Sequence, residues 1–197
     1  GPSKTADIEQ SLVIGAHGTI LVDAGLPDSE HKVEAALRRE NRRMEDISLI
    51  VVTHAHVDHA GSASRIRERS GAPIVGHEAD ASHFGRETPM TFCPTGWFGR
   101  LFLCTKLMLE PYVGFRPDIE LAAGAEFDMA PYGVDGVIRH TPGHTEGSIS
   151  VELPTGDALV GDLLASGILL GGIARTDHAK RPDRKSTRLN SSHATLS

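Results

Sequence analysis

Short apolar runs separated by polar turns recur along the first half of the chain. Residues 11–14 and 19–22 predict two strands around the turn at 16–18. Residues 49–52 are wholly apolar, and residues 74–75 form a shorter run of the same kind. Wholly apolar runs of this length are typical of strands that are covered on both faces. We therefore expect these strands to lie inside a layered structure.

Two segments of the first half have the spacing of helices. In the predicted helix 28–43 and just past its end, Val33, Leu37 and Met44 share one side, at spacings of four and seven residues. The segment 61–69 is predicted to be a second helix, which ends before a glycine and a proline. Each apolar strand is thus followed by a helical segment.

The second half is richer in strands. Strands are predicted at 137–140, 148–153 and 158–160. Early alternation of strands and helices, followed by pairs of strands, indicates an α/β fold built in layers.

Residues 85–117 interrupt this rhythm. The segment contains Trp97 and five of the eight other aromatic residues: Phe92, Phe98, Phe102, Tyr112 and Phe115. One interpretation is a helical hairpin that completes the core. The other is a lid-like insertion whose apolar side chains, Trp97 and Phe98 among them, form a wall of the substrate pocket.

The composition bounds the class of protein. The chain has 197 residues, 39% of them hydrophobic and 23% charged, which suits one packed domain. No apolar run approaches the ~20 residues of a membrane-spanning helix. Two cysteines cannot form a disulfide framework. With no recognisable targeting segment either, we expect a cytoplasmic protein that does not bind a membrane.

Both ends of the chain look foreign to the domain. Residues 1–3 resemble a cloning scar, and residues 183–197 resemble an in-frame translation of a sequencing-library adapter. The other interpretation of the second segment is an ordinary polar tail. An adapter would indicate a gene assembled from short reads, as in a metagenome. We therefore expect the domain to span 4–182.

The charge balance bears on the partner. The net charge is −6, and residues 183–197 carry +2, which leaves −8 on the rest of the chain. An acidic surface repels phosphate backbones. We therefore expect a small-molecule substrate and no nucleic acid.

The strongest chemical signal directly follows the apolar run at 49–52. His54, His56, Asp58 and His59 fall within six residues. Imidazole nitrogens and carboxylate oxygens are the ligands that zinc binds in proteins. Three histidines and an aspartate in this order indicate a metal site, whereas a lone histidine would not.

Further residues of the same types stand where other predicted strands end. His144 lies in the tight turn 141–145, Asp162 follows the strand at 158–160, and Asp23 follows the strand at 19–22. Each alone is a weak signal, because an aspartate at a strand end is usually a turn residue. Several such loops together are how α/β folds build sites.

These residues and their order resemble the metallo-β-lactamase superfamily of metal-dependent hydrolases, over about residues 8–180. The resemblance implies a four-layer αβ/βα sandwich with a dinuclear metal site at one edge of the paired sheets. By position, it implies that one metal is bound by His54, His56 and His144, that the second is bound by Asp58 and His59, that Asp162 bridges both, and that Asp23 supports the metal-binding loops from behind.

The chain departs from the family pattern after Asp162. Family members continue with further elements and a last histidine that completes the second metal site, and neither His178 nor His193 fits that position. We therefore expect a sandwich that is incomplete at the C-terminus and a second site that lacks one ligand. An incomplete sandwich exposes a sheet edge or an apolar face, which predicts a homo-oligomer that covers it. Should residues 183–197 be ordered, crystal contacts alone would be the competing explanation.

The chemistry that the resemblance implies is hydrolysis by a metal-bound hydroxide, with Asp58 orienting the nucleophile. Zinc is the expected metal, and iron and manganese are the alternatives. An aspartate at the position of Asp162 argues against a dedicated lactamase and favours an ester, thioester or lactone of a small molecule. Two alternatives stay open: a truncated metal-binding protein without turnover, and a phosphodiesterase or nuclease.

Overall fold

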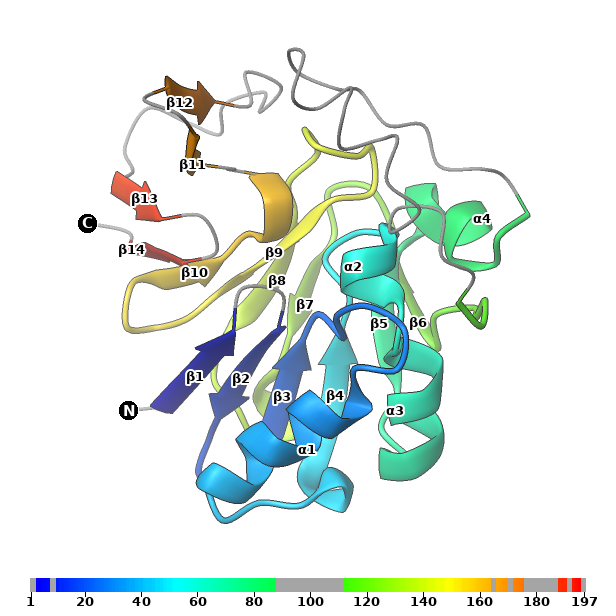
Figure 1. The fold of residues 1–197 in the computed structure, drawn as a ribbon, viewed down its shortest axis with the longest axis vertical. Helices are drawn as coiled ribbons and strands as arrows, with labels where there is room; N and C mark the ends of the chain where they lie inside the picture. The colour runs from blue at the N-terminus through cyan, green and yellow to red at the C-terminus, as the bar shows by residue number, and fades with distance from the viewer. Residues whose placement is uncertain are drawn as a thin grey trace.

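The computed structural model describes the backbone of residues 3–7, 10–87, 112–163, 166–169, 172–175, 188–190 and 193–195, and the side chains of residues 10–87 and 112–162. Within these ranges the strands form two six-stranded sheets and one two-stranded hairpin. Figure 1 shows the two large sheets stacked, with α1 and α3 on the outer face of the first sheet. The expected α/β sandwich is confirmed.

The first sheet combines antiparallel and parallel pairing. The first three strands are antiparallel neighbours, and the remaining pairs are parallel. In spatial order they are β1 (Ser3–Asp7), β2 (Gln10–Ile14), β3 (Thr19–Val22), β4 (Ile47–Val51), β5 (Ile74–His77) and β6 (Ile119–Leu121).

The second sheet is antiparallel throughout. Its spatial order is β13 (Arg188–Asn190), β14 (His193–Thr195), β10 (Asp157–Leu159), β9 (Ile149–Glu152), β8 (Val137–His140) and β7 (Glu126–Asp128), and the separate hairpin is β11 (Ser166–Leu169) with β12 (Gly172–Arg175). Two of these strands, β13 and β14, belong to the segment expected to be foreign, and their backbone continues the sheet beside β10.

The helices lie after the parallel strands. They are α1 (Glu30–Arg39), α2 (Val57–Ala60), α3 (Ala63–Ser70) and α4 (Ala81–Phe84), and the short 3-10 turns are Met44–Asp46, Glu78–Asp80, Ala130–Tyr132 and Gly161–Leu163. The first helix is shorter than the predicted 28–43, because the chain turns at Asn41 with a left-handed φ of 54°. Met44 nevertheless packs against the same core from outside the helix.

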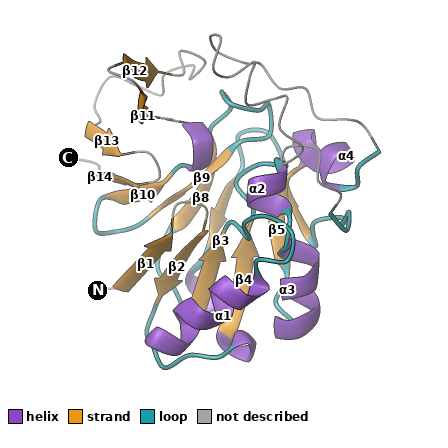
Figure 2. Ribbon diagram, viewed as in Figure 1, coloured by secondary structure: helices purple, strands orange, loops and turns teal. Residues whose placement is uncertain are grey.

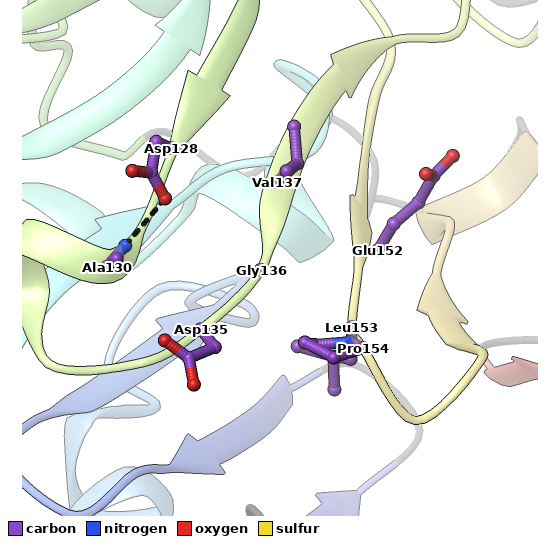
Figure 3. Close-up of a pocket in the computed structure, with 8 residues that line it drawn as sticks. All are labelled: Asp128, Ala130, Asp135, Gly136, Val137, Glu152, Leu153 and Pro154. Carbon is purple, nitrogen blue, oxygen red and sulfur yellow. Dashed lines mark hydrogen bonds between the residues drawn. The ribbon is translucent and has the colours of Figure 1, made fainter.

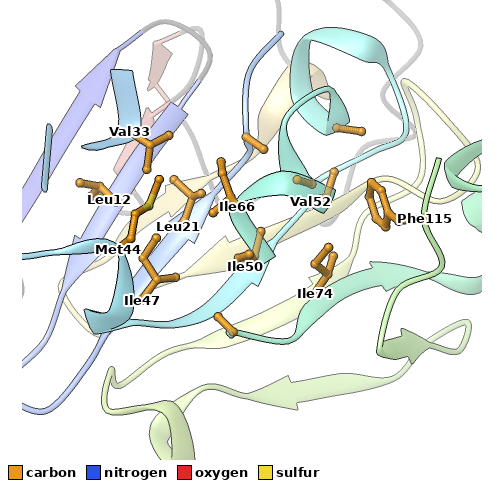
Figure 4. Packing of buried hydrophobic residues seen from close by; sticks show 14 of the residues in the cluster. Leu12, Leu21, Val33, Met44, Ile47, Ile50, Val52, Ile66, Ile74 and Phe115 are labelled. Atoms are coloured by element: carbon orange, nitrogen blue, oxygen red, sulfur yellow. The ribbon is translucent and has the colours of Figure 1, made fainter. Parts of the chain in front are cut away.

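Alternate residues of the first sheet enter two different cores. Leu21 and Ile50 face the helices, whereas Ile20 and Leu49, their neighbours in sequence, face the second sheet. Figure 4 shows Val33 of α1 gathered with the sheet residues of the first core. This double burial explains why these strands are continuous apolar runs.

The end of the segment 85–117 belongs to the core. Phe115 is buried, with its ring centroid 5.3 Å from that of Phe84. Trp97 and Phe98, the expected pocket residues, lie outside the described residues, so their role stays a prediction.

Candidate metal centre

Five loops meet at one edge of the two sheets. The strands β3, β4 and β5 are parallel, so the loops that follow them emerge at the same edge. Figure 2 shows these loops around α2. The backbone N–H of Ile149 donates to the Thr53 carbonyl at 2.9 Å, which fastens the second sheet to the loop after β4. The loops after β8 and β10 therefore reach the same place.

The first donor group consists of His54, His56 and His144. His54 Nε2 lies 3.0 Å and His144 Nε2 lies 2.9 Å from His56 Nδ1, and the three ring centroids are 4.5 to 4.8 Å apart. Nitrogens that share one tetrahedral zinc lie about 3.3 Å from one another. The three nitrogens thus converge on one point at nearly the spacing of zinc ligands.

The second donor group consists of Asp58 and His59, and Asp162 faces both groups. His59 Nε2 lies 3.8 Å from Asp58 Oδ2 and 3.4 Å from Asp162 Oδ1. The other oxygen of Asp162 lies 3.7 Å from His144 Nε2 in the first group. The donor atoms of each group together with Asp162 lie within 4.8 Å of one another.

Asp23 stands behind both groups and accepts hydrogen bonds from three donors. Its carboxylate accepts from the Thr53 N–H at 2.8 Å, from the Thr53 hydroxyl at 2.9 Å and from His59 Nδ1–H at 2.9 Å. Because the Thr53 hydroxyl donates to Asp23, His54 Nδ1–H donates to Thr53 at 3.1 Å. Both histidines are therefore held in the tautomer that turns Nε2 toward the centre.

Burial keeps the first donor group neutral. It lowers the pKa of His54 well below its usual range, lowers that of His56 to about 3, and lowers that of His144, and the neighbouring imidazoles add to the effect at His54 and His56. Unprotonated imidazoles are the form that binds a metal.

The second donor group is charged. Burial opposes a charge on His59, yet the surrounding carboxylates, Asp23 first among them, raise its pKa well above the usual range. Burial also disfavours ionised Asp162, but the His59 hydrogen bond and the nearby imidazoles lower the pKa of Asp162 to about 2. Burial raises the pKa of Asp58.

The donor set fits a metal cation. Three carboxylates surround His59, and a single imidazolium neutralises the charge of only one of them. Asp58 Oδ1 is buried and has no hydrogen-bond partner among the described residues. Buried charge of one sign is unfavourable unless it is paired or bound to a metal. A cation between the groups would supply the missing countercharge.

A family model described as the metallo-beta-lactamase superfamily matches residues 6–189. The chain belongs to this superfamily. A hydroxyacylglutathione hydrolase of Anaeromyxobacter dehalogenans is 28% identical over 152 residues, which are 75% of this chain and 44% of that protein.

Two solved structures of superfamily members show the same fold. A metallo-β-lactamase of Cronobacter sakazakii with the HARLDQ motif has a TM-score of 0.59 at 28% identity and covers 77% of this chain and 54% of its own. A class B3 di-zinc metallo-β-lactamase from an Alaskan soil metagenome has a TM-score of 0.55 at 26% identity, with 72% and 49% covered. The chain spans about half the length of the curated relatives that it matches.

All six residues to which the superfamily resemblance assigns metal binding come together, and Asp23 lies behind them as expected. That they bind a metal stays a prediction. His178 and His193 lie outside the residues whose side chains are described. Thr53 and Asp80 were missed by the sequence analysis. Thr53 could have been found from its position just after a parallel strand, where loops of α/β folds carry function. Asp80 had no such signal.

A hollow among the described residues lies away from this centre. A cavity of about 300 Å³ is lined by Asp128, Asp135 and Glu152 at the ends of β7 and β9. Figure 3 shows these residues around the start of β8, whereas His144 follows the end of β8.

Within the described residues, no helix is long and apolar enough to cross a membrane.

We expect the two donor groups to take up zinc with different pH dependence. Metal binding to His59 displaces a proton, because its raised pKa leaves the metal-free imidazole protonated at neutral pH. The affinity of the second site should therefore fall about tenfold for each pH unit of acidification. The pKa values of His54, His56 and His144 are lowered, so the affinity of the first site should change less with pH.

Titration calorimetry in two buffers of different ionisation enthalpy measures the protons released per metal. Equal proton release at both binding steps would contradict the assignment of charge to the second group.

Proposed function

We propose that the protein is a zinc-dependent hydrolase of an ester, thioester or lactone of a small molecule. The observation that carries the proposal is the position of Asp162, whose two oxygens lie 3.4 Å from His59 Nε2 and 3.7 Å from His144 Nε2. One carboxylate thus serves both donor groups, as two metals held close together require. The relative named a hydroxyacylglutathione hydrolase supports a thioester in particular.

The first donor group with Asp162 would hold one metal, and the second donor group with the same carboxylate would hold the other. A bound metal pair supplies Lewis acidity, which makes hydroxide available from water at neutral pH and polarises the carbonyl of the substrate.

The chain's own residues orient the reactants. Asp58 Oδ1 is buried and without a partner among the described side chains, so it can accept a hydrogen bond from the attacking water. Asp23 holds His59 by Nδ1, which keeps Nε2 directed toward the centre. No serine or cysteine nucleophile is needed in this scheme.

The test uses the full chain loaded with zinc, and separately with iron(II) and manganese(II), each with its metal content measured. The substrates are S-lactoylglutathione, p-nitrophenyl acetate, a γ-lactone and bis(p-nitrophenyl) phosphate. We expect kcat/KM to be highest with zinc, for one of the three acyl substrates, and to disappear when the metal is removed. The control variant is Asp128→Asn. It removes a carboxylate outside the metal centre, which accepts a hydrogen bond from the nearby Ala130 N–H at 2.9 Å.

Two outcomes would contradict the proposal. Preferred cleavage of the phosphodiester would favour the phosphodiesterase alternative. Full zinc occupancy with no hydrolysis of any acyl substrate would favour a metal-binding protein without turnover.

A further inference from the structure

A buried carboxylate outside the expected ligand set lies between two loops of the centre. Asp80 ends the short turn Glu78–Asp80 that follows β5, and only 2% of it is exposed. It is not among the residues that could hold a metal. A buried carboxylate needs hydrogen-bond donors to offset the loss of water, so its partners show what it does.

The partners of Asp80 come from both loops that carry the first donor group. Asp80 Oδ2 accepts from the Ala55 N–H at 3.2 Å and from the Thr145 hydroxyl at 2.9 Å. Asp80 Oδ1 accepts from the Gly147 N–H at 3.0 Å. One side chain thus joins the loop after β4 to the loop after β8.

The bonded atoms are next to the imidazole-bearing residues. Ala55 stands between His54 and His56, and Thr145 directly follows His144. The bond from the Thr145 N–H to Ser148 Oγ at 2.9 Å, by contrast, stays within the His144 loop. Asp80 therefore connects the backbone beside His144 to the backbone between His54 and His56. These two histidines lie 90 and 88 residues before His144 in the sequence.

The close approach of Asp80 to the His144 loop also requires a glycine. A Cβ atom at Gly147 would lie 2.5 Å from Asp80 Oδ1, well inside contact distance. The absence of a side chain at Gly147 thus leaves room for the Asp80 carboxylate.

We propose that Asp80 is a positioning residue that sets the distance between His144 and the His54–His56 pair, and so the affinity and geometry of the first metal site. The inference rests on the metal binding within the proposed function. A carboxylate is required, because all three partners are donors and both oxygens are used. Asparagine would place an N–H group against a backbone N–H or the Thr145 hydroxyl.

The experiment measures zinc affinity by competition with a chelator and the visible absorption spectrum of the cobalt-loaded chain. We expect Asp80→Asn to weaken binding at the first site about 10- to 100-fold, and to change the cobalt bands, which report ligand geometry. Thr145→Val removes one of the three donors and should show a smaller change of the same kind. Thr145→Ser keeps the hydroxyl and should restore the wild-type affinity and spectrum.

The matched control is Asp118→Asn. Asp118 also accepts from a backbone N–H, that of Ile74 at 2.9 Å, but it lies at the start of β6 and touches neither loop. It should leave zinc affinity and the cobalt spectrum unchanged. If Asp80→Asn does not fold, Thr145→Val decides alone.

Unchanged affinity and an unchanged cobalt spectrum in Asp80→Asn or, failing that, Thr145→Val would overturn the inference, even if the metal-free variant melts at a lower temperature. Because both readouts concern metal binding, a wild-type chain that binds zinc and hydrolyses nothing would reject the proposed function and leave this test intact.

Discussion

Asp58→Asn should lower kcat by roughly 10²- to 10⁴-fold on the best acyl substrate, the range expected for loss of a group that handles a proton in the transition state. The buried Oδ1 of Asp58 is free to accept from the attacking water, and burial raises the pKa of this carboxyl group. An amide in its place cannot take up a proton. Steady-state kinetics on the zinc-loaded variant, with excess zinc present, measure the effect.

Metal content must be measured alongside, because Asp58 also belongs to the second donor group. The Asp128→Asn chain serves as the control and should keep its wild-type kcat. A variant at position 58 that retains both metals and more than about a tenth of wild-type kcat would show that Asp58 does not orient the nucleophile.

The second large effect is expected on stability. Asp23→Ala should lower the free energy of unfolding of the metal-free chain by about 3–5 kcal/mol, because three buried donors, His59 Nδ1–H among them, lose their acceptor. Thr53 loses the acceptor of its N–H and of its hydroxyl in the same change. Denaturant unfolding of the metal-free protein measures the loss.

The control for this change is Asp118→Ala. The Asp118 side chain is 43% exposed and accepts from one backbone N–H and, at 3.4 Å, from the half-exposed Arg67 guanidinium. The control substitution should cost only about 1 kcal/mol. A cost of that size for Asp23→Ala as well would mean that the three bonds of Asp23 contribute little to folding.

The strands β2 to β5 of the first sheet were predictable because their signal is local. Residues 20–22 and 49–51 are apolar on both faces, as strands between a helix layer and a second sheet must be. The predicted strand at 137–140 matches β8 without a shift. The strands β6 and β7 were not predicted, because each has three residues and two of the three in β7 are exposed acids.

Helix ends were less predictable than helix positions. The end of α3 was signalled by Gly71, which adopts a φ of 75°. The end of α1 had a weaker signal, because Asn41 takes the left-handed conformation less often than glycine does and the apolar spacing continues past it to Met44. Met44 packs on the same core from outside the helix, so the apolar spacing continues although the helix has ended.

The sequence by itself determined the candidate metal ligands of the loop after β4. Residue type and spacing indicate His54, His56, Asp58 and His59 as ligands, since four donors within six residues cannot lie far apart. Only the tertiary structure decided how His144 and Asp162 join them, because those residues lie 85 and more positions away, after strands of the other sheet. The role of Asp80 was likewise invisible in the sequence, because a lone aspartate acquires meaning only from the donors that folding places around it.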